Sequence, residues 1–300
     1  MRVFVTGATG FVGGWLRQEL TASRHEVIDA PGPDELDIAD RAGLALAVAD
    51  ARPDVVVHLA AIAFGPEATS DPGEAIRVNV GGTLAVVEAC RALTPQPAIL
   101  AVGSAEVYAP PVTSDPLTEH SPLGPRGVYG LTKLAAEAIA RLAADDGLAV
   151  AVTRSFNHAG PGQRPVFALP AFAQRILEAR AAGTHEIRAG NVDVARDISD
   201  VRDVVRAYRL LAEALVDRHS PGGARIYNVA SGRAHTMRSI IAELASLADW
   251  PVSIVQDREL MRTNDPLHIQ GDATALRALT GWTPQIEMRR TLADVLASLA

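Results

Sequence analysis

The sequence is poor in several residue types, and each shortage excludes a class of protein. Its 300 residues include one cysteine, Cys90, so no internal disulfide and no cysteine-based zinc site can form, and we expect no bound metal. Acidic side chains outnumber basic ones by 35 to 28, and the net charge of −7 argues against a nucleic-acid binder. No uncharged apolar run is long enough to span a membrane.

The sequence also lacks the features of an exported protein. Its first residues, Met1–Gly7, reach glycine too soon to act as a signal peptide. We therefore expect a soluble, cytoplasmic protein without membrane or nucleic-acid partners. Hydrophobic residues make up 48% of the chain and charged residues 21%, so the chain can build a sizeable core.

Apolar segments of strand length alternate with longer segments of helical periodicity. Strands are predicted at Arg2–Thr6, Glu26–Asp29, Asp54–Leu59, Ala98–Gly103 and Leu148–Arg154, and helices at Phe11–Thr21, Arg41–Ala51, Ala75–Ala92 and Val128–Ala144. Apolar strands separated by helices indicate an α/β fold with a doubly wound parallel sheet that is covered on both faces. Ligands of such sheets bind at the C-terminal ends of the strands.

The alternation weakens after about residue 160, where segments rich in Gly, Pro and Arg interrupt it. We predict a sheet domain made of residues 1–162 and 198–232. Residues 163–197 and 233–300 are predicted to form a smaller, interleaved substrate lobe.

A glycine-rich turn, Gly7-Ala8-Thr9-Gly10-Phe11-Val12-Gly13, follows the first predicted strand and opens the first helix. Glycines at this spacing let the backbone approach a pyrophosphate, and the helix N-terminus supplies free N–H groups. A tight strand-to-helix turn without a ligand is the alternative. Its place on the first strand favours a dinucleotide site.

Residues near the second strand bear on which dinucleotide would bind. Asp37, followed by Ile38, is placed to meet an adenine amino group, or else to cap the next helix. The second strand ends at Asp29, and Ala30, Pro31 and Gly32 follow without a basic residue for a 2′-phosphate. That favours NAD(H) over NADP(H), unless Arg17 or another distant arginine serves.

The distribution of basic residues singles out one helix. Of the 28 basic residues 27 are arginine, and the one lysine, Lys133, follows Tyr129 by four positions. This spacing puts both side chains on one helix face, and a compact ammonium favours tyrosinate, which predicts a lowered pKa for Tyr129. Tyr129 would then exchange a proton with a sugar or alcohol oxygen near neutral pH. The alternative is a surface tyrosine stacked on a lysine stem.

Ser104 ends the fourth predicted strand, at the rim where sites of this fold form. Its hydroxyl is placed to hold a carbonyl beside Tyr129, with Glu106 two residues further on; a plain turn residue is the alternative. The sequence has no GxSxG nucleophile elbow, Walker lysine loop or HExxH motif.

Together these residues resemble the extended short-chain dehydrogenase/reductase family of NAD-dependent epimerase/dehydratase type. The matching motifs are Gly7–Gly13, Asp37, His58-Leu59-Ala60-Ala61, Asn79-Val80-Gly81-Gly82-Thr83, Ser104 and Tyr129-Gly130-Leu131-Thr132-Lys133. The resemblance implies a Rossmann domain that binds NAD(H) or NADP(H), a nucleotide-sugar lobe, and catalysis by Ser104, Tyr129, Lys133 and Glu106. The implied cofactor contacts are Gly7, Gly10, Phe11, Val12, Gly13, Asp37, Ile38, Leu59, Ala60, Ala61, Asn79, Tyr129 and Lys133.

A second set of motifs resembles the GDP-6-deoxy-4-keto-mannose reductases within that family. The set comprises Arg154–Gln163, Gly190–Asp197 and Asp200–Asp203. The resemblance implies that Asn157 contacts the sugar diphosphate, Arg196 the nucleotide, Arg262 a phosphate and Asp265 a ribose hydroxyl, with Ser104 and Glu106 completing the substrate site. It also implies a GDP-sugar substrate and a homodimer formed through the helices around Leu84–Ala92 and Val128–Ala144.

The residue between Ser104 and Glu106 separates the reactions open to this family. A 4,6-dehydratase needs an extra acid and base after its serine or threonine, but Ala105 cannot exchange protons. This favours reduction of a 4-keto sugar. A 4,6-dehydratase or 4-epimerase with tightly bound NAD remains the alternative, and a non-catalytic dinucleotide-sensing module a remote one. Tyr108-Ala109-Pro110 departs from the usual Tyr-Gly, so the path of this loop stays open.

Overall fold

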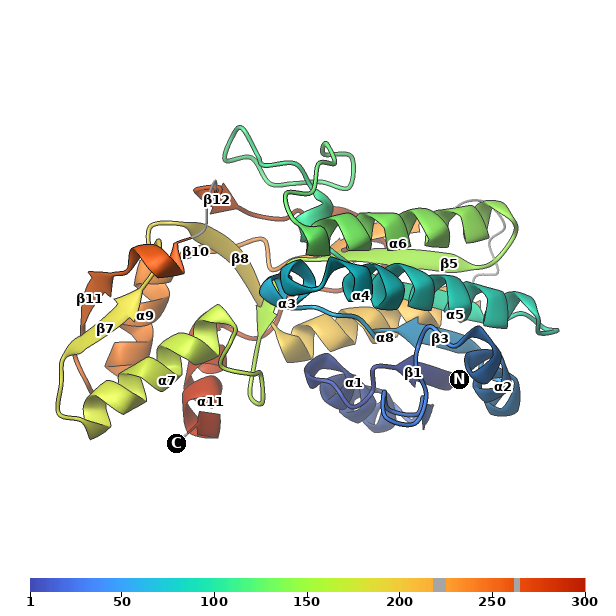
Figure 1. Cartoon of the computed structure of the whole chain (residues 1–300), viewed down its shortest axis with the longest axis horizontal. Coiled ribbons are helices and arrows are strands. Elements are labelled where there is room, and N and C mark those ends of the chain that lie inside the picture. Colours follow the sequence, from blue (N-terminus) through green and yellow to red (C-terminus); the bar gives the residue numbers. More distant parts are fainter. Residues whose placement is uncertain (218–224, 262–264, 300) are drawn as a thin grey trace.

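The fold centres on a six-stranded parallel sheet (Figure 1), in a computed structural model that describes residues 1–217, 225–261 and 265–299. The strands are β1 (Arg2–Thr6), β2 (Glu26–Asp29), β3 (Val55–His58), β4 (Ala98–Ser104), β5 (Val150–Ser155) and β9 (Arg225–Val229). Their order, β2-β1-β3-β4-β5-β9, reverses beside β1, which is the switch point where such sheets bind ligands. The predicted doubly wound α/β sheet is confirmed, and each of the five predicted strands forms within two residues of its expected ends.

Helices cover both faces of the sheet because the apolar side chains along each strand point alternately to one face and to the other. On one face Val3, Val5 and Leu100 pack against α1 (Phe11–Ala22), α8 (Val201–Asp217) and α10 (Thr274–Thr280). On the other face Phe4 and Ile99 pack against α2 (Arg41–Ala51), α5 (Gly82–Arg91) and α6 (Val128–Asp145). Strands buried on both sides explain the near-continuous apolar runs in the sequence.

One predicted helix is wrong in its continuity. The segment predicted as Ala75–Ala92 consists of α4 (Pro72–Ile76), a π-helical turn at Arg77–Gly81, and α5. The extra backbone residue of a π turn changes which side chain faces inward. Asn79 is buried in this turn, and its amide contacts the backbone of Ile62 and the hydroxyl of Thr132.

The rest of the chain gathers beyond the C-terminal ends of the sheet, on the left of Figure 1. Its strands are β6 (Asn157–Ala159), β7 (Glu186–Ala189), β8 (Ala195–Asp200), β10 (Ala234–Thr236), β11 (Ser253–Gln256) and β12 (His268–Ile269). Its helices α7 (Ala168–Ala181), α9 (Met237–Leu247) and α11 (Met288–Leu299) share an apolar core with β7 and β8. The exact division into a sheet domain and an interleaved lobe stays a prediction. Within the described ranges no helix is long and apolar enough to cross a membrane.

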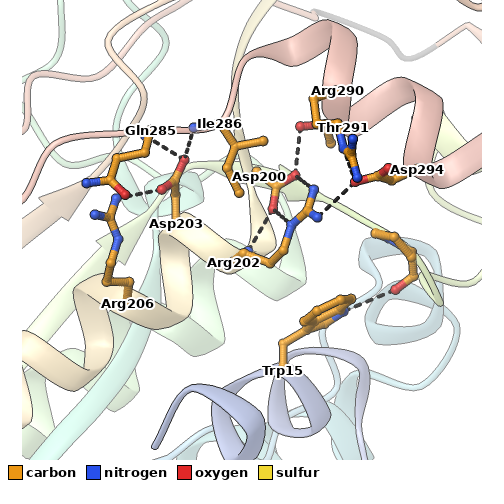
Figure 2. A network of polar contacts seen from close by, with 11 residues as sticks. Trp15, Asp200, Arg202, Asp203, Arg206, Gln285, Ile286, Arg290, Thr291 and Asp294 are labelled. Atoms are coloured by element: carbon orange, nitrogen blue, oxygen red, sulfur yellow. Dashed lines mark hydrogen bonds and ion pairs between the residues drawn. The ribbon is translucent and has the colours of Figure 1, made fainter. Parts of the chain in front are cut away.

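Charged side chains join the start of α8 to the C-terminal segment, as Figure 2 shows. Asp200 accepts a hydrogen bond from Thr291 Oγ1 at 2.8 Å, and Arg202 pairs with Asp294 at 2.8 Å. Asp203 accepts from the backbone N–H groups of residues 285 and 286, both at 2.9 Å. The motif Asp200–Asp203, which resembles a reductase signature, therefore ties α11 and the residues just before it to the end of β8 and the start of α8.

A buried ion pair holds α6 against β5. The Arg154 guanidinium contacts both carboxylate oxygens of Glu137, at 2.9 and 2.6 Å, and the two side chains are 2% and 1% exposed. Arg154 also lies over the Tyr108 ring at 4.9 Å and donates to the Glu119 carbonyl at 2.9 Å. The Tyr108 hydroxyl donates to Asn228 Oδ1 at 2.6 Å. The loop after Ser104 is thus tied to β5 and β9, which settles its path.

Replacement of Glu137 with glutamine should lower the free energy of unfolding by about 3 kcal/mol, because it leaves the buried Arg154 charge uncompensated. Urea denaturation followed by circular dichroism measures this loss. The double variant Glu137→Gln, Arg154→Met should recover part of it. A loss below about 1 kcal/mol for the single variant would contradict the assignment.

Candidate active site

A cleft of about 1690 Å³ opens at the C-terminal ends of the strands. Most of the predicted site residues meet there, although they come from segments far apart in the sequence. The predicted residues that line the cleft are Gly7, Gly10, Phe11, Val12, Gly13, Asp37, Ile38, Leu59, Ala60, Ala61, Ser104, Glu106, Tyr129, Lys133, Asn157, Arg196 and Asp265. Arg262 lies outside the described residues. Asn79 does not line the cleft, and its role is to hold residue 62 of the cleft wall in place.

The glycine turn is shaped by its contact with the segment after β3. Gly7 has a φ of +71°, and a Cβ there would lie 2.8 Å from the Ala60 backbone nitrogen. The turn therefore needs glycine for both its conformation and its packing. Helix α1 begins beyond Gly10 without a side-chain cap or an acidic first turn, so its N-terminus suits an anionic group such as a pyrophosphate. These features fit a dinucleotide.

Asp37 lines the cleft and contacts one near neighbour and one distant residue. It accepts a hydrogen bond from the Ala39 N–H at 2.9 Å and pairs with Arg77. The Ala39 N–H, followed by the Arg77 guanidinium, lowers the pKa of Asp37. The residue that caps α2 is Asp40, so capping is not the role of Asp37.

Arg17, named above as the alternative contact for a 2′-phosphate, already pairs with an acidic side chain. Arg17 Nη1 lies 3.1 Å from Asp29 Oδ2, at the end of β2. Both side chains are partly exposed, and such a pair is weak enough to exchange partners. Arg17 is therefore compatible with either NAD(H) or NADP(H).

Ser104, Tyr129 and Lys133 come together where α6 packs on the end of β4. Lys133 is buried, and its ammonium donates to the Val102 carbonyl at 2.8 Å. Ser104 Oγ accepts from the Glu106 N–H at 3.1 Å, and Ser104 and Tyr129 both line the cleft. These three residues and Glu106 all line the cleft, and their roles stay a prediction.

The expected pKa of Tyr129 is wrong in direction. Burial raises the pKa of Tyr129 well above its usual value, the nearby Glu106 charge raises it further, and only the Ser104 hydrogen bond opposes this rise. Loss of water around a phenol disfavours tyrosinate more strongly than the lysine four residues away favours it. Tyr129 therefore holds its proton at neutral pH.

Burial also acts on the two basic groups behind Tyr129. It lowers the pKa of Lys133 to about 8. Burial, together with the Lys133 charge, lowers the pKa of His58 to about 3, so this imidazole is neutral. The Lys133 ammonium is thus held where burial disfavours its positive charge. None of its described contacts is with a carboxylate.

A series of hydrogen bonds between buried polar side chains, which the sequence did not predict, holds the cleft wall in place. Thr83 Oγ1 donates to the Asn79 carbonyl at 2.8 Å, so it accepts from His58 Nε2 at 3.1 Å. His58 Nδ1 then accepts from Thr6 Oγ1 at 2.8 Å, and Thr6 Oγ1 accepts from the Ala60 N–H at 3.3 Å. Polar residues at the ends of apolar strands were the available signal.

His158 and Gln163 also line the cleft, although the sequence indicated them only as part of the motif Arg154–Gln163. His158 stacks on Phe11 with ring centroids 6.4 Å apart, and its Nδ1 lies 3.1 Å from the Phe156 carbonyl. Gln163 is buried, and its Nε2 donates to the His158 carbonyl at 3.1 Å. Its Oε1 is buried without a hydrogen-bond partner. Both residues line the cleft, so Gln163 Oε1 is an acceptor suited to a ligand N–H or O–H group.

The two residues expected to bind the nucleotide contact each other. Arg196 Nη2 lies 2.5 Å from Asp265 Oδ1, and Arg196 Nη1 donates to the Pro266 carbonyl at 2.8 Å. Asn157 is exposed on the cleft wall nearby. No group of three or more potential metal ligands occurs among the described residues.

The chain is similar in sequence and in structure to known proteins. The sequence model of the NAD dependent epimerase/dehydratase family matches residues 3–230. The chain belongs to this family. It is an enzyme of the NAD(P)-dependent, Rossmann-fold class that the sequence predicted, and Ser104, Tyr129 and Lys133 on the cleft wall argue against a non-catalytic dinucleotide sensor.

Full-length relatives within the epimerase/dehydratase family include reductases and epimerases. GDP-6-deoxy-D-mannose reductase of Pseudomonas aeruginosa is 35% identical, and the match covers 99% of this chain and 96% of the relative. The structure of RMD from Pseudomonas aeruginosa complexed with NADPH has a TM-score of 0.88 at 33% identity, over 99% of this chain and 98% of the other. UDP-glucose 4-epimerase from Thermus thermophilus in complex with NAD has a TM-score of 0.84 at 26% identity, over 100% and 99%.

The lowered pKa of Lys133 predicts a pH dependence of stability. Between pH 8 and 10.5 the unfolded chain binds a proton at Lys133 that the folded chain has lost, so the free energy of unfolding should rise with pH over this window. Urea denaturation of the parent and of Lys133→Met between pH 7.5 and about 10.5 isolates the effect, because the variant lacks the titrating group. Equal slopes in both proteins would contradict a strained ammonium.

Proposed function

We propose that this enzyme reduces the 4-keto group of a nucleotide-linked 4-keto-6-deoxy sugar with NAD(P)H. The expected substrate is of the GDP-4-keto-6-deoxymannose type, which yields a GDP-rhamnose type of product. The observation that carries the proposal is that Ser104, Tyr129 and Lys133 all line the cleft, Ser104 at the end of β4 and the other two on α6. The similarity to a GDP-6-deoxy-D-mannose reductase over the full chain supports the choice of sugar and base.

The proposed reaction needs a hydride at C4 and a proton on the C4 oxygen. A bound reduced nicotinamide supplies the hydride. Ser104 donates a hydrogen bond to the carbonyl oxygen, and Tyr129 transfers its proton to that oxygen as the negative charge develops. Lys133 is protonated below its pKa of about 8, so its positive charge would stabilise the transient tyrosinate four residues away on α6.

The protonated state of Tyr129 supports reduction. Burial raises the pKa of Tyr129, so the phenol is ready to give a proton at neutral pH, whereas dehydratases and epimerases begin with removal of a hydroxyl proton. Ala105 adds to this argument because it leaves no proton-exchanging side chain between Ser104 and Glu106.

We propose the cofactor and substrate residues in the arrangement that the sequence indicated. The glycine turn, Leu59–Ala61, Asp37 and Ile38 would hold the dinucleotide, and Gln163 would accept from one of its donors. Asn157, Arg196, Asp265, Glu106 and Arg262 would hold the nucleotide sugar. Arg196 and Asp265 pair with each other. Binding of the nucleotide therefore either breaks this pair or contacts both side chains while they stay paired.

A 4,6-dehydratase or 4-epimerase that retains NAD is the second candidate. It is favoured by the absence of a basic residue directly after β2, which weakens the case for NADPH. UDP-glucose 4-epimerase of Azospirillum brasilense, 29% identical over 95% of this chain and 87% of the relative, is an example of this branch.

Assays with purified protein separate the candidates. With GDP-4-keto-6-deoxymannose present, NADPH or NADH should be oxidised, and Tyr129→Phe should lower kcat by about 10²- to 10⁴-fold because the proton donor is lost. The corresponding dTDP-linked keto sugar is the control for the base. Conversion of GDP-mannose without added cofactor would identify a dehydratase, and it would contradict the reductase proposal.

We also propose that two copies pair through α5 and α6. Leu84, Leu131 and Leu142 on these helices are 39%, 58% and 64% exposed, an apolar surface that a partner would cover. Light scattering at micromolar concentration should give twice the chain mass of 31.6 kDa. Leu142→Glu should shift the mass toward one chain, and Leu46→Glu on α2 should not. A monomeric parent would contradict the pairing. The cytoplasmic location stays a prediction.

A further inference from the structure

Four side chains span the cleft from one wall to the other. Phe64 and Glu67 belong to the segment that follows β3 and forms α3 (Gly65–Ser70), while Arg164 and Phe167 precede α7. Glu67 Oε1 lies 3.0 Å from Arg164 Nη1, and Oε2 lies 3.5 Å from Nη2. The Phe64 and Phe167 rings meet edge to face with centroids 5.3 Å apart. We call these four residues the cleft bridge.

A contact between two members of the cleft bridge on the same segment also stabilises it. The Arg164 guanidinium lies 6.0 Å from the centroid of the Phe167 ring, so the ionic and aromatic contacts share a residue pair. All four members line the cleft. Breaking one contact should therefore weaken the other, because both join the same two segments.

Each end of the cleft bridge continues into residues of the proposed cofactor site. Phe64 follows the segment Leu59–Ala61, which packs against Gly7 of the glycine turn. Arg164 directly follows Gln163, whose unpartnered Oε1 is buried at the cleft. The cleft bridge thus crosses the cleft beside the switch point of the sheet, where a dinucleotide would lie.

We propose that the cleft bridge is a gate that controls the exchange of the dinucleotide cofactor. The inference rests on the proposed function, since NAD(P)H has to enter and leave in every turnover of a reductase. The bridge consists of contacts between protein side chains, and none of these contacts requires a bound cofactor. Opening then precedes both entry and exit of the cofactor.

The strength of the contacts suits a gate that opens easily. Glu67 and Arg164 are 47% and 58% exposed, and an exposed ion pair of this kind contributes little. The aromatic pair adds a contact of similar size. A gate that is equally closed with and without ligand changes the rates of binding and release but not the affinity.

Stopped-flow fluorescence with NADPH, repeated with NADH, tests the gate. In Glu67→Ala and Arg164→Ala, the association and dissociation rate constants should both rise about threefold to tenfold, as expected for loss of contacts of this strength. The dissociation constant should stay within about twofold, because both rates change together. The exchanged pair Glu67→Arg, Arg164→Glu should return both rates toward those of the parent.

A matched control comes from an ion pair outside the cleft lining. Arg238 and Asp193 lie 2.8 Å apart and are 55% and 60% exposed, close to the values of the bridge pair. Asp193→Ala should leave both rate constants for NADPH and NADH unchanged. This control separates an effect of the bridge from a general effect of removing a surface charge.

The remaining outcomes overturn the inference. Unchanged rate constants in the bridge variants, with NADPH or NADH still bound by the parent, would show that the bridge is no gate. A rise in the dissociation rate alone, with a matching rise in the dissociation constant, would show direct contact with the cofactor instead. Failure of the parent to bind either dinucleotide would overturn the proposed function itself.

Discussion

The site depends on how closely the first turns of α6 approach the end of β4. A Cβ on Gly130 would lie 2.5 Å from the Glu106 carbonyl oxygen, so only glycine lets the two backbones meet at this distance. The same approach lets Lys133 reach the Val102 carbonyl at 2.8 Å and brings Tyr129 to the cleft that Ser104 also lines. A helix displaced outward by one side chain would move Tyr129 and Lys133 together away from Ser104.

Buried polar groups maintain this approach from both sides. Along α6 the Glu137–Arg154 pair joins the helix to β5, and Arg154 in turn contacts Tyr108 in the loop after Ser104. Closer to the cleft, Thr132 accepts from Asn79, whose amide also holds residue 62 of the facing wall. Since unpaired polar groups are costly inside a protein, these networks allow few alternative positions for α6.

Desolvation then sets the chemistry of the assembled groups. It raises the pKa of Tyr129 and lowers those of Lys133 and His58, so each group is shifted toward its neutral form. A neutral phenol beside a strained ammonium and a neutral imidazole is an arrangement suited to donating a proton. The four residues of the cleft bridge line the same cleft.

Local periodicity and spacing were enough to predict the sheet, the glycine turn and the helix on which Tyr129 and Lys133 share a face. Strands buried on both faces are apolar whatever surrounds them, and an i, i+4 pair shares a helix face in any protein. The tertiary structure alone decided the π turn at Asn79, the pairing of Arg196 with Asp265, and the direction of the Tyr129 pKa shift. These depend on partners many residues away and on exclusion of water, which no local pattern contains.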